Sequence, residues 1–270
     1  MNRFYVITNQ VKDKSLETTY RIKNYIESKG KECILAVEGQ EVPETIDCVL
    51  VLGGDGTIIR AARELRSQDI PLLGINMGTL GYLAEVEVSS IEESIDRLIA
   101  GEIQVEERMM LRGTVNGKLE DIALNDIVLS RTGALRIIQF NIYVNGELLN
   151  TYRADGIIIS TPTGSTAYNL SAGGPIVEPT AAMIVITPIC SHALNTSSIV
   201  LSAEDEIVLE IGEGRDGRIE EAGISFDGER NIEVHTGDKV VIQKAEHTTK
   251  LLKLSKVSFL EILRKKMEGN

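Results

Sequence analysis

The sequence has few cysteines, no long hydrophobic run and no secretory leader pattern. Its 270 residues hold three cysteines, at positions 33, 48 and 190, and no Cys-x-x-Cys pair. This spacing argues against a structural zinc site and predicts small buried thiols in a reducing cytoplasm. No stretch approaches the roughly 18 apolar residues that span a bilayer, and the N-terminus lacks a signal-peptide pattern. We therefore expect a cytoplasmic protein.

Positive charge is also scarce. The chain has 28 Lys and Arg against 40 Asp and Glu, a formal net charge of −12. Such a chain repels nucleic-acid backbones and anionic membrane surfaces, and no basic run offsets this repulsion. We expect neither nucleic acid nor a membrane as a partner. A ligand with phosphates would need local arginines, backbone N–H groups or a divalent cation.

The order of apolar patterns predicts α/β plus all-β architecture in two domains. The first hundred residues alternate apolar runs with helical patterns, as parallel sheets require; the runs are 4–8, 32–37, 48–53 and 71–76, and the helices 14–30, 57–68 and 89–101. Later strand-like stretches follow one another with Asn-Gly and Asp-Gly hairpin turns. We expect a Rossmann-like α/β domain over 1–101, a β-sandwich-like domain over 102–250, and a C-terminal helix within 251–270 that returns to the first domain.

A glycine-rich turn, Gly-Gly-Asp-Gly-Thr at 53–57, follows the apolar run 48–53. It joins an expected strand to an expected helix, where open α/β sheets bind ligands. Glycines let a phosphate approach the backbone, but the P-loop lysine and the Gly-x-Gly-x-x-Gly spacing are absent. Asp55 would hold a metal, accept a proton or bind a hydroxyl. A tight turn with Asp55 capping the helix explains these residues equally well.

A second glycine-bearing loop follows the next expected strand, within 75–86. It has Gly78 and Gly81 beside Asn76. The two loops would line one crevice, because carboxyl ends of neighbouring parallel strands meet at one edge of a sheet. The alternative is a pair of unrelated turns.

The stretch 152–179 is the least ordinary part of the chain. An expected strand leads into Thr-Pro-Thr-Gly-Ser-Thr at 161–166, a short helix through Tyr168, and Gly-Gly-Pro at 173–175. Clustered hydroxyls and glycines in an apolar framework favour polar ligand contacts. In this reading Tyr168 stacks on a base; the alternative is a Ser/Thr-rich loop.

A polar pair, Asn125 and Asp126, interrupts the expected strand 123–131. Both residue types are disfavoured in strands, so the pair faces either a ligand or water. The three histidines, at 192, 235 and 247, form no metal-ligand pattern.

In order and spacing, these four motifs resemble the NAD kinase family. They are Gly53 to Thr57, Asn76 to Leu83, Asn125-Asp126, and Asp155 to Pro175. Gly-Gly-Asp-Gly-Thr is a weak signal, because diacylglycerol-kinase-like and phosphofructokinase relatives share it, whereas the longer Thr-Pro-Thr-Gly-Ser-Thr-Ala-Tyr segment is a strong one. The motifs cover residues 50 to 190, and the family's two-domain plan accounts for both ends.

The resemblance implies transfer of the terminal phosphoryl group of ATP to the 2′-hydroxyl of the adenosine ribose of NAD, giving NADP. It implies Mg²⁺ or another divalent cation, with unidentified metal ligands, an active site between the two domains, and a homodimer or homotetramer. Polyphosphate stays open as an alternative donor. Phosphoryl transfer mostly needs positioning and charge stabilisation, which suits glycine cradles.

The resemblance also assigns roles to residues. Asp55 would accept the proton of the 2′-hydroxyl or orient it, and Gly56 would give a backbone contact. Asn125 and Asp126 would bind the adenosine part of NAD. The remaining nucleoside and the phosphates would contact Asp155, Thr163, Thr166, Ala167, Tyr168, Asn169, Leu170 and Ser171. Arg60, Arg136 and Arg153 match positions where the family has basic or polar contacts, and they would offset the acidic charge.

The sequence departs from the family pattern at three places. The family's Asn-Glu is Asn125-Asp126 here, which keeps the charge on a shorter side chain, and Tyr82 replaces phenylalanine. After His192, where many members have an arginine, the chain has Ser197 and Ser198, which weakens any arginine contact there.

Two other functions remain possible on the residues. One is a lipid or sugar-phosphate kinase of the Gly-Gly-Asp-Gly-Thr group, although 161–175 has no evident use for an acyl chain. The other is a non-catalytic NAD(P)-sensing module, for which Asp55 would be unnecessary.

Overall fold

The computed structural model describes residues 1–37, 39–40, 42–43, 45–65, 68–78, 81–132, 137–191, 197–214, 217–255 and 257–268. Contacts divide the chain into two compact units, Met1–Arg108 with Thr249–Asn270, and Met109–Thr248. The sequence predicts the boundaries between the two domains at residues 101 and 251, close to the observed boundaries at 108 and 249.

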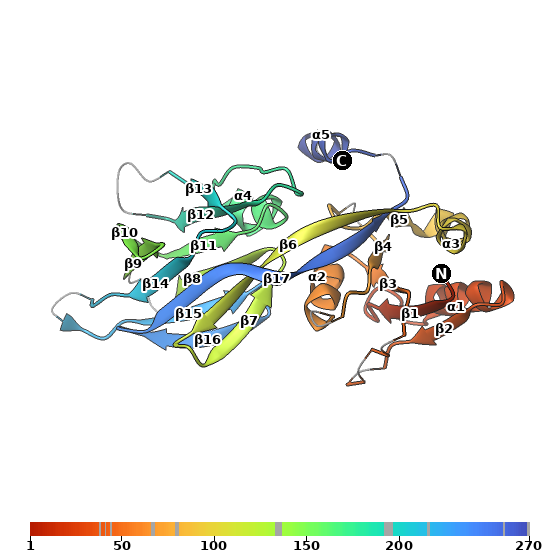
Figure 1. Ribbon diagram of the computed structural model, residues 1–270, viewed down its shortest axis with the longest axis horizontal. Helices are drawn as coiled ribbons and strands as arrows, with labels where there is room; N and C mark the ends of the chain where they lie inside the picture. The colour runs from red at the N-terminus through yellow and green to blue at the C-terminus, as the bar shows by residue number, and fades with distance from the viewer. Residues whose placement is uncertain are drawn as a thin grey trace. The chain divides into compact units, whose positions relative to one another are not determined.

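The first unit is built on a parallel sheet. Strands β1 (Arg3–Thr8), β2 (Glu32–Leu35), β3 (Cys48–Gly53) and β4 (Leu72–Asn76) lie in the order β2-β1-β3-β4. Helices α1 (Glu17–Ser28) and α3 (Ile91–Ala100) lie on one face and α2 (Asp55–Glu64) on the other (Figure 1). Coverage of both faces explains why these strands are continuous apolar runs, and the predicted α/β domain is confirmed.

The C-terminal helix belongs to this first unit, as predicted. Strand β5 (Val86–Glu87), which pairs with β4, and the short helix η1 (Val88–Ser90) lead into α3. The chain leaves the first unit after Arg108 and returns at Thr249, before α5 (Phe259–Met267). Ser258 caps α5, because its hydroxyl accepts the N–H of Glu261 at 3.2 Å. The ring of Phe259 lies 6.3 Å from the ring of Tyr82, measured between centroids.

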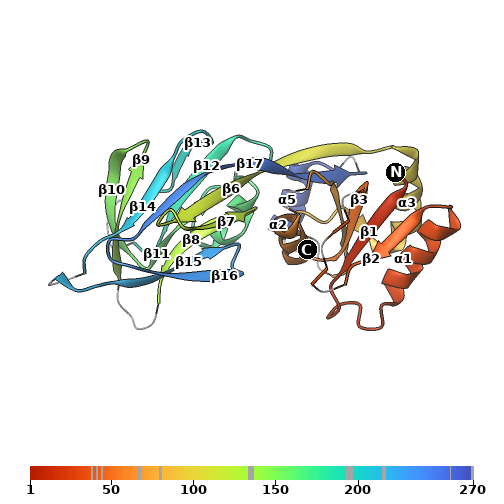
Figure 2. The same ribbon diagram turned by 60° about the horizontal axis from the view of Figure 1, so that its bottom comes forward.

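The second unit consists of two antiparallel sheets that pack face to face (Figure 2). One sheet has the order β13-β12-β11-β8-β15-β16; in the other, β10-β9-β14-β17 continues through β6 to β7. The strands are β6 (Gln104–Val115), β7 (Leu119–Ala123), β8 (Asp126–Arg131), β9 (Ile138–Val144), β10 (Glu147–Ala154), β11 (Gly156–Ser160), β12 (Met183–Ile189), β13 (Ile199–Ser202), β14 (Ile207–Ile211), β15 (Glu221–Phe226), β16 (Arg230–His235) and β17 (Lys239–Lys253).

Side chains from both sheets form one hydrophobic cluster, which includes Phe140, Ile157, Ile224 and Ile242. Strands β9 and β14 alternate buried and part-exposed residues, as half-buried strands do, and each buried large side chain contributes roughly 1.5–3 kcal/mol. The predicted β-sandwich-like domain is confirmed. Its Asn-Gly and Asp-Gly turns have positive φ angles, for example 51° at Asn145 and 82° at Gly146.

Candidate active site

Three loops meet at the carboxyl edge of the parallel sheet in the first unit. They follow β1, β3 and β4. Asn9, directly after β1, donates its backbone N–H to the carbonyl of Leu52 at 2.8 Å and its side-chain amide to Thr57 Oγ1 at 3.2 Å. A Cβ at Gly53 would lie 2.3 Å from the same Thr57 Oγ1, so only glycine fits there. The glycine-rich turn is thus hydrogen-bonded to the loop that follows β1.

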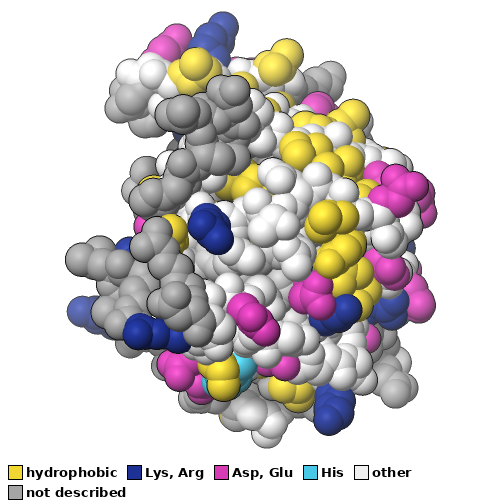
Figure 3. Space-filling model, turned by 90° about the vertical axis from the view of Figure 1, so that its left-hand side faces the viewer, with side chains coloured by type: hydrophobic (Ala, Val, Ile, Leu, Met, Phe, Trp, Pro, Cys, Tyr) yellow, Lys and Arg dark blue, Asp and Glu magenta, His cyan; other side chains and the backbone are white. Residues whose placement is uncertain are grey.

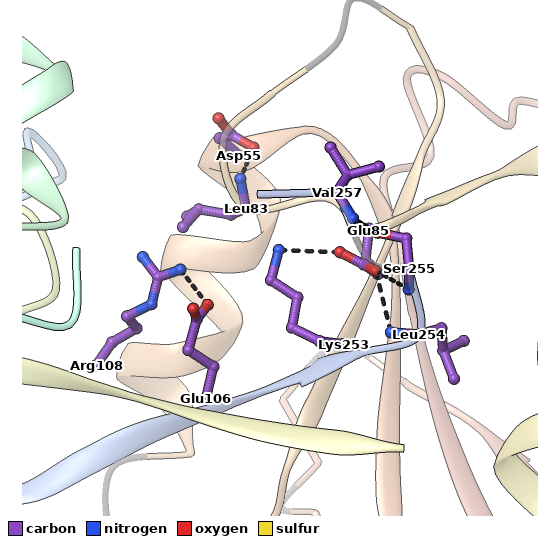
Figure 4. Close-up of polar contacts among 9 residues, drawn as sticks. All are labelled: Asp55, Leu83, Glu85, Glu106, Arg108, Lys253, Leu254, Ser255 and Val257. Carbon is purple, nitrogen blue, oxygen red and sulfur yellow. Dashed lines mark hydrogen bonds and ion pairs between the residues drawn. The ribbon is translucent and has the colours of Figure 1, made fainter. Parts of the chain in front are cut away.

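Asp55 joins the two glycine-bearing loops. Its carboxylate accepts the backbone N–H of Tyr82 at 2.7 Å. It also accepts that of Leu83 at 3.1 Å (Figure 4). A Cβ at Gly81 would lie 2.0 Å from Asp55 Oδ1, which explains the glycine. The N-cap position of α2 is Gly54, and the hydrogen bonds of the Asp55 carboxylate go to the other loop. The alternative that Asp55 caps α2 is therefore wrong, and so is that of two unrelated turns.

The C-terminal segment supports the loop that binds Asp55. The nearly buried carboxylate of Glu85 accepts Lys253 Nζ at 2.9 Å and the N–H groups of Leu254 at 3.0 Å and Ser255 at 2.6 Å (Figure 4). Lys266 Nζ lies 4.6 Å from the centre of the Tyr82 ring. Burial, and to a lesser degree the charge of Asp55, raise the pKa of Tyr82. No local sequence pattern marks these roles, because they depend on contacts between residues up to 170 positions apart.

Lys12 lies at the same loops and was also missed. A Cβ at Gly54 would lie 3.1 Å from Lys12 Nζ, and one at Gly78 would lie 3.0 Å from it. By contrast, Arg60, which the resemblance suggested, lies on the exposed side of α2, where its Nε is 3.8 Å from Glu64.

In the second unit, the motif residues meet where β11 and β15 end and β8 begins. Ser160 pairs with Asp126, and Phe226 with Ile127. Thr161 donates its hydroxyl to the carbonyl of Leu124 at 2.6 Å and its N–H to that of Asn125 at 2.8 Å. A Cβ at Gly164 would lie 2.1 Å from that same carbonyl oxygen of Asn125. The turn 161–164, which contains buried Thr163, therefore lies against Asn125-Asp126.

Asp227 organises this edge. From the turn between β15 and β16, its carboxylate accepts three N–H groups, those of Leu124 at 2.8 Å, Asn125 at 2.8 Å and Asp126 at 3.1 Å. The sequence marked its Asp-Gly pair only as a hairpin turn. Burial, and then the negative charge of Asp227, raise the pKa of Asp126 to about 7. Asp126 is thus held with its proton over much of the acidic range.

The following segment, η2 (Gly164–Thr166) and α4 (Tyr168–Ser171), is anchored by one buried amide. Asn169 donates to the carbonyls of Ser165 at 3.0 Å and Pro175 at 2.9 Å, and its oxygen accepts the hydroxyl of Thr187 at 2.7 Å. Its side chain is therefore occupied within the fold. Around it, Thr166 and Ala167 are part-buried, and Tyr168, Leu170 and Ser171 are exposed.

Other candidates lie elsewhere. Asp155 precedes β11, at the end of that strand opposite to Ser160, roughly 16 Å away along the strand. It forms an ion pair with Arg131 at 3.0 Å. Arg153 lies on β10 and donates to Gln139 Oε1 at 2.9 Å. Arg136 and His192 lie outside the described residues.

Among the described residues, no group of three or more His, Cys, Asp or Glu side chains could hold a metal ion. In the same residues, no helix has the length and apolar character needed to cross a bilayer.

Comparisons with known proteins match both units. The family description ATP-NAD kinase N-terminal domain fits residues 4–103, and ATP-NAD kinase C-terminal domain fits residues 124–254. The NAD kinase of Agathobacter rectalis is 49% identical over 282 residues, covering 100% of this chain and 99% of the relative. That of Lachnospira eligens is 46% identical over 293 residues, covering 99% and 100%.

Two solved structures share the fold. The yeast NADH kinase complexed with NADH has a TM-score of 0.88 at 23% identity, covering 100% of this chain and 88% of that one. The NAD kinase of Archaeoglobus fulgidus in complex with ATP has a TM-score of 0.81 at 26% identity, covering 98% and 97%. The resemblance drawn from four sequence motifs is confirmed: the chain belongs to the NAD kinase family.

Proposed function

We propose that the chain transfers the terminal phosphoryl group of ATP to the 2′-hydroxyl of the adenosine ribose of NAD, giving NADP and ADP. The observation that carries this proposal is the carboxylate of Asp55, held by two N–H groups where the glycine-bearing loops meet. Such preorganised placement is what phosphoryl transfer needs.

Asp55 acts as the proton acceptor in this proposal. Each carboxylate oxygen has lone pairs beyond the one used by Tyr82 or Leu83, so it can still accept the O–H of the ribose. As the ribose oxygen bonds to the terminal phosphorus, the bond to the bridging oxygen breaks and ADP leaves. The hydroxyl proton passes to Asp55, and Gly56 contributes a backbone contact.

The second unit supplies contacts to the nucleosides and phosphates in this proposal. Asn125 and Asp126 bind the adenosine part of NAD, Thr163 and the exposed side of 166–171 contact the remaining ligand, and Tyr168 stacks on a base. Asn169 holds this segment through its buried amide. The contacts suggested for Asp155, Arg60, Arg136 and Arg153 stay predictions.

The oxygen ligands that the glycine-bearing loops offer fit a Mg²⁺ ion that is held mainly by the phosphates of ATP. The described residues offer no multi-ligand cage, and Asp55 is a carboxylate at the loops. Mg²⁺ commonly uses one or two carboxylates together with substrate phosphates and water. When bound, it would neutralise part of the phosphate charge.

We also propose a cytoplasmic homodimer or homotetramer. Strand β10 ends its sheet, and Leu148 and Leu149 on it are 57% and 38% exposed. Figure 3 shows a band of hydrophobic side chains on the face that it draws, with acidic groups beside it. Exposed edges and apolar patches favour association. Light scattering should give the mass of two or four chains; a monomer at micromolar concentration would contradict this.

The activity itself is tested with a matrix of donors and acceptors. With Mg²⁺, we expect the purified protein to form NADP from ATP and NAD, and the matrix also tests polyphosphate and NADH. No NADP with any donor would refute the proposal, and tight NAD binding without turnover would support a sensing role instead.

A further inference from the structure

Lys12 lies at the loops of the proposed active site and has no role in the proposed function. It follows β1, whereas the Gly-Gly-Asp-Gly-Thr turn follows the neighbouring strand β3. From β1 the chain enters α1 on one face of the sheet, and from β3 it enters α2 on the other (Figure 1). Loops that diverge in this way leave the crevice in which open α/β sheets bind ligands.

The backbone around Lys12 is fixed. The carbonyl of Asn9 accepts the N–H groups of Lys12 and Asp13, each at 3.0 Å, and Asn9 Oδ1 accepts the N–H of Val11 at 3.0 Å. Asn9 is in turn bonded to Leu52 and Thr57 of the glycine-rich turn. The backbone of Lys12 is therefore held beside that turn, and its side chain is exposed.

The ammonium group of Lys12 has no carboxylate partner among the described residues. Its neighbour Asp13 is buried and accepts the N–H of Thr19 at 2.9 Å and the Thr19 hydroxyl at 2.7 Å, as a cap for α1. Asp55 directs its carboxylate to Tyr82 and Leu83. In a chain of net charge −12, a lysine left without an acidic partner beside two glycine-bearing loops is available to an anion.

A second observation points to the same kind of ligand. Helix α2 begins at Asp55, and among the described residues no acceptor bonds the N–H of Asp55 or Gly56. First-turn N–H groups carry partial positive charge and bind phosphates. The ammonium of Lys12 and these N–H groups thus lie at one turn, with Gly54 between them.

We propose that Lys12 binds the phosphate chain of the phosphoryl donor and is a specificity-determining residue for the reaction. The inference rests on the proposed function, because Asp55 then marks the position of the ribose hydroxyl. The group that must reach this hydroxyl is the terminal phosphoryl group of the donor. The ammonium group of Lys12 therefore binds the phosphates of the donor rather than the diphosphate of NAD. One lysine–phosphate contact is expected to change donor affinity about 10- to 100-fold.

The test compares Lys12→Met with Lys14→Met, a matched control at an exposed lysine two residues away. With varied ATP and saturating NAD, kcat/KM for ATP should fall about 10- to 100-fold in Lys12→Met only. KM for NAD should stay within about twofold of the wild-type value, and Lys12→Arg should recover part of the loss. A rise in KM for NAD alone would show that Lys12 binds NAD instead of ATP. An equal loss of kcat/KM for ATP in Lys12→Met and Lys14→Met would show that Lys12 has no specific role. Either result overturns the proposal.

Binding of inorganic tripolyphosphate by calorimetry, without NAD, separates this inference from the proposed function. Weaker binding by Lys12→Met than by the wild type or Lys14→Met would support the inference even if no NADP formed. Equal binding by all three, or no binding by the wild type at millimolar tripolyphosphate, would overturn it.

Discussion

Replacement of Asp55 by Asn is expected to lower kcat for NADP formation about 10²- to 10⁴-fold, the usual contribution of a general base. Asn keeps the size of the side chain but has no charge and accepts a proton poorly. Its single oxygen can also serve only one of the N–H groups of Tyr82 and Leu83, which the carboxylate now bonds together. Steady-state rates with saturating ATP and NAD measure the effect.

The structural part of this loss has a matched control. Asp47, just before β3 at the opposite end of that strand, accepts the N–H groups of Asn2 at 2.5 Å and Arg3 at 3.1 Å. Both N–H groups bond the same oxygen, Oδ2, and lower the pKa of that carboxyl. Asp47→Asn therefore removes a carboxylate charge that backbone N–H groups stabilise, at a site remote from the loops, and should keep its activity. If Asp55→Asn retained more than about a tenth of the wild-type kcat, Asp55 would not be the proton acceptor.

Local chemistry accounts for the parts of the fold that the sequence predicted. The apolar runs of β3 and β4 are buried on both faces, and the Asn-Gly pair at 145–146 adopts the positive φ angles that its turn requires. The boundaries were less accurate. The helix expected at 57–68 is α2, Asp55–Glu64, because its first turn lies inside the glycine-rich motif.

The sequence predicts the motifs of the candidate site but not the residues that hold these motifs in place. The turn at 53–57 and the pair Asn125-Asp126 stand out by composition alone. Glu85, Lys12 and Asp227 carry no local signal, because each acts through partners distant in the chain; Asp227, for example, bonds N–H groups about 100 residues earlier. Asn169 illustrates the converse: it lies in a recognisable motif, yet its amide is used by Ser165, Pro175 and Thr187.

Asp126 makes the stability of the fold depend on pH. In the folded chain its pKa is raised to about 7 from an ordinary value of 3.8, by burial and by the charge of Asp227. Between these values the unfolded chain releases the proton and the folded chain keeps it. The free energy of unfolding contributed by Asp126 therefore falls as pH rises from about 4 to about 7, and is constant above that range.

Asp126→Asn removes this titration with little change of shape. Compared with the wild type, the variant should become progressively more stable as pH rises from about 4 to 7, by a total on the order of a few kcal/mol, and the difference should then level off. Urea unfolding at a series of pH values measures it. Asp227→Asn removes the neighbouring negative charge and should lower the folded-state pKa of Asp126. The pH range over which stability changes should then end at a lower pH.

The same titration bears on the substrate. If Asp126 binds the adenosine part of NAD, KM for NAD should change between about pH 6 and 8 in the wild type and stay flat in Asp126→Asn, because only the wild-type carboxyl changes charge there. A stability difference that does not vary with pH would mean that Asp126 is ionised throughout, and an unchanged KM would remove it from the substrate contacts.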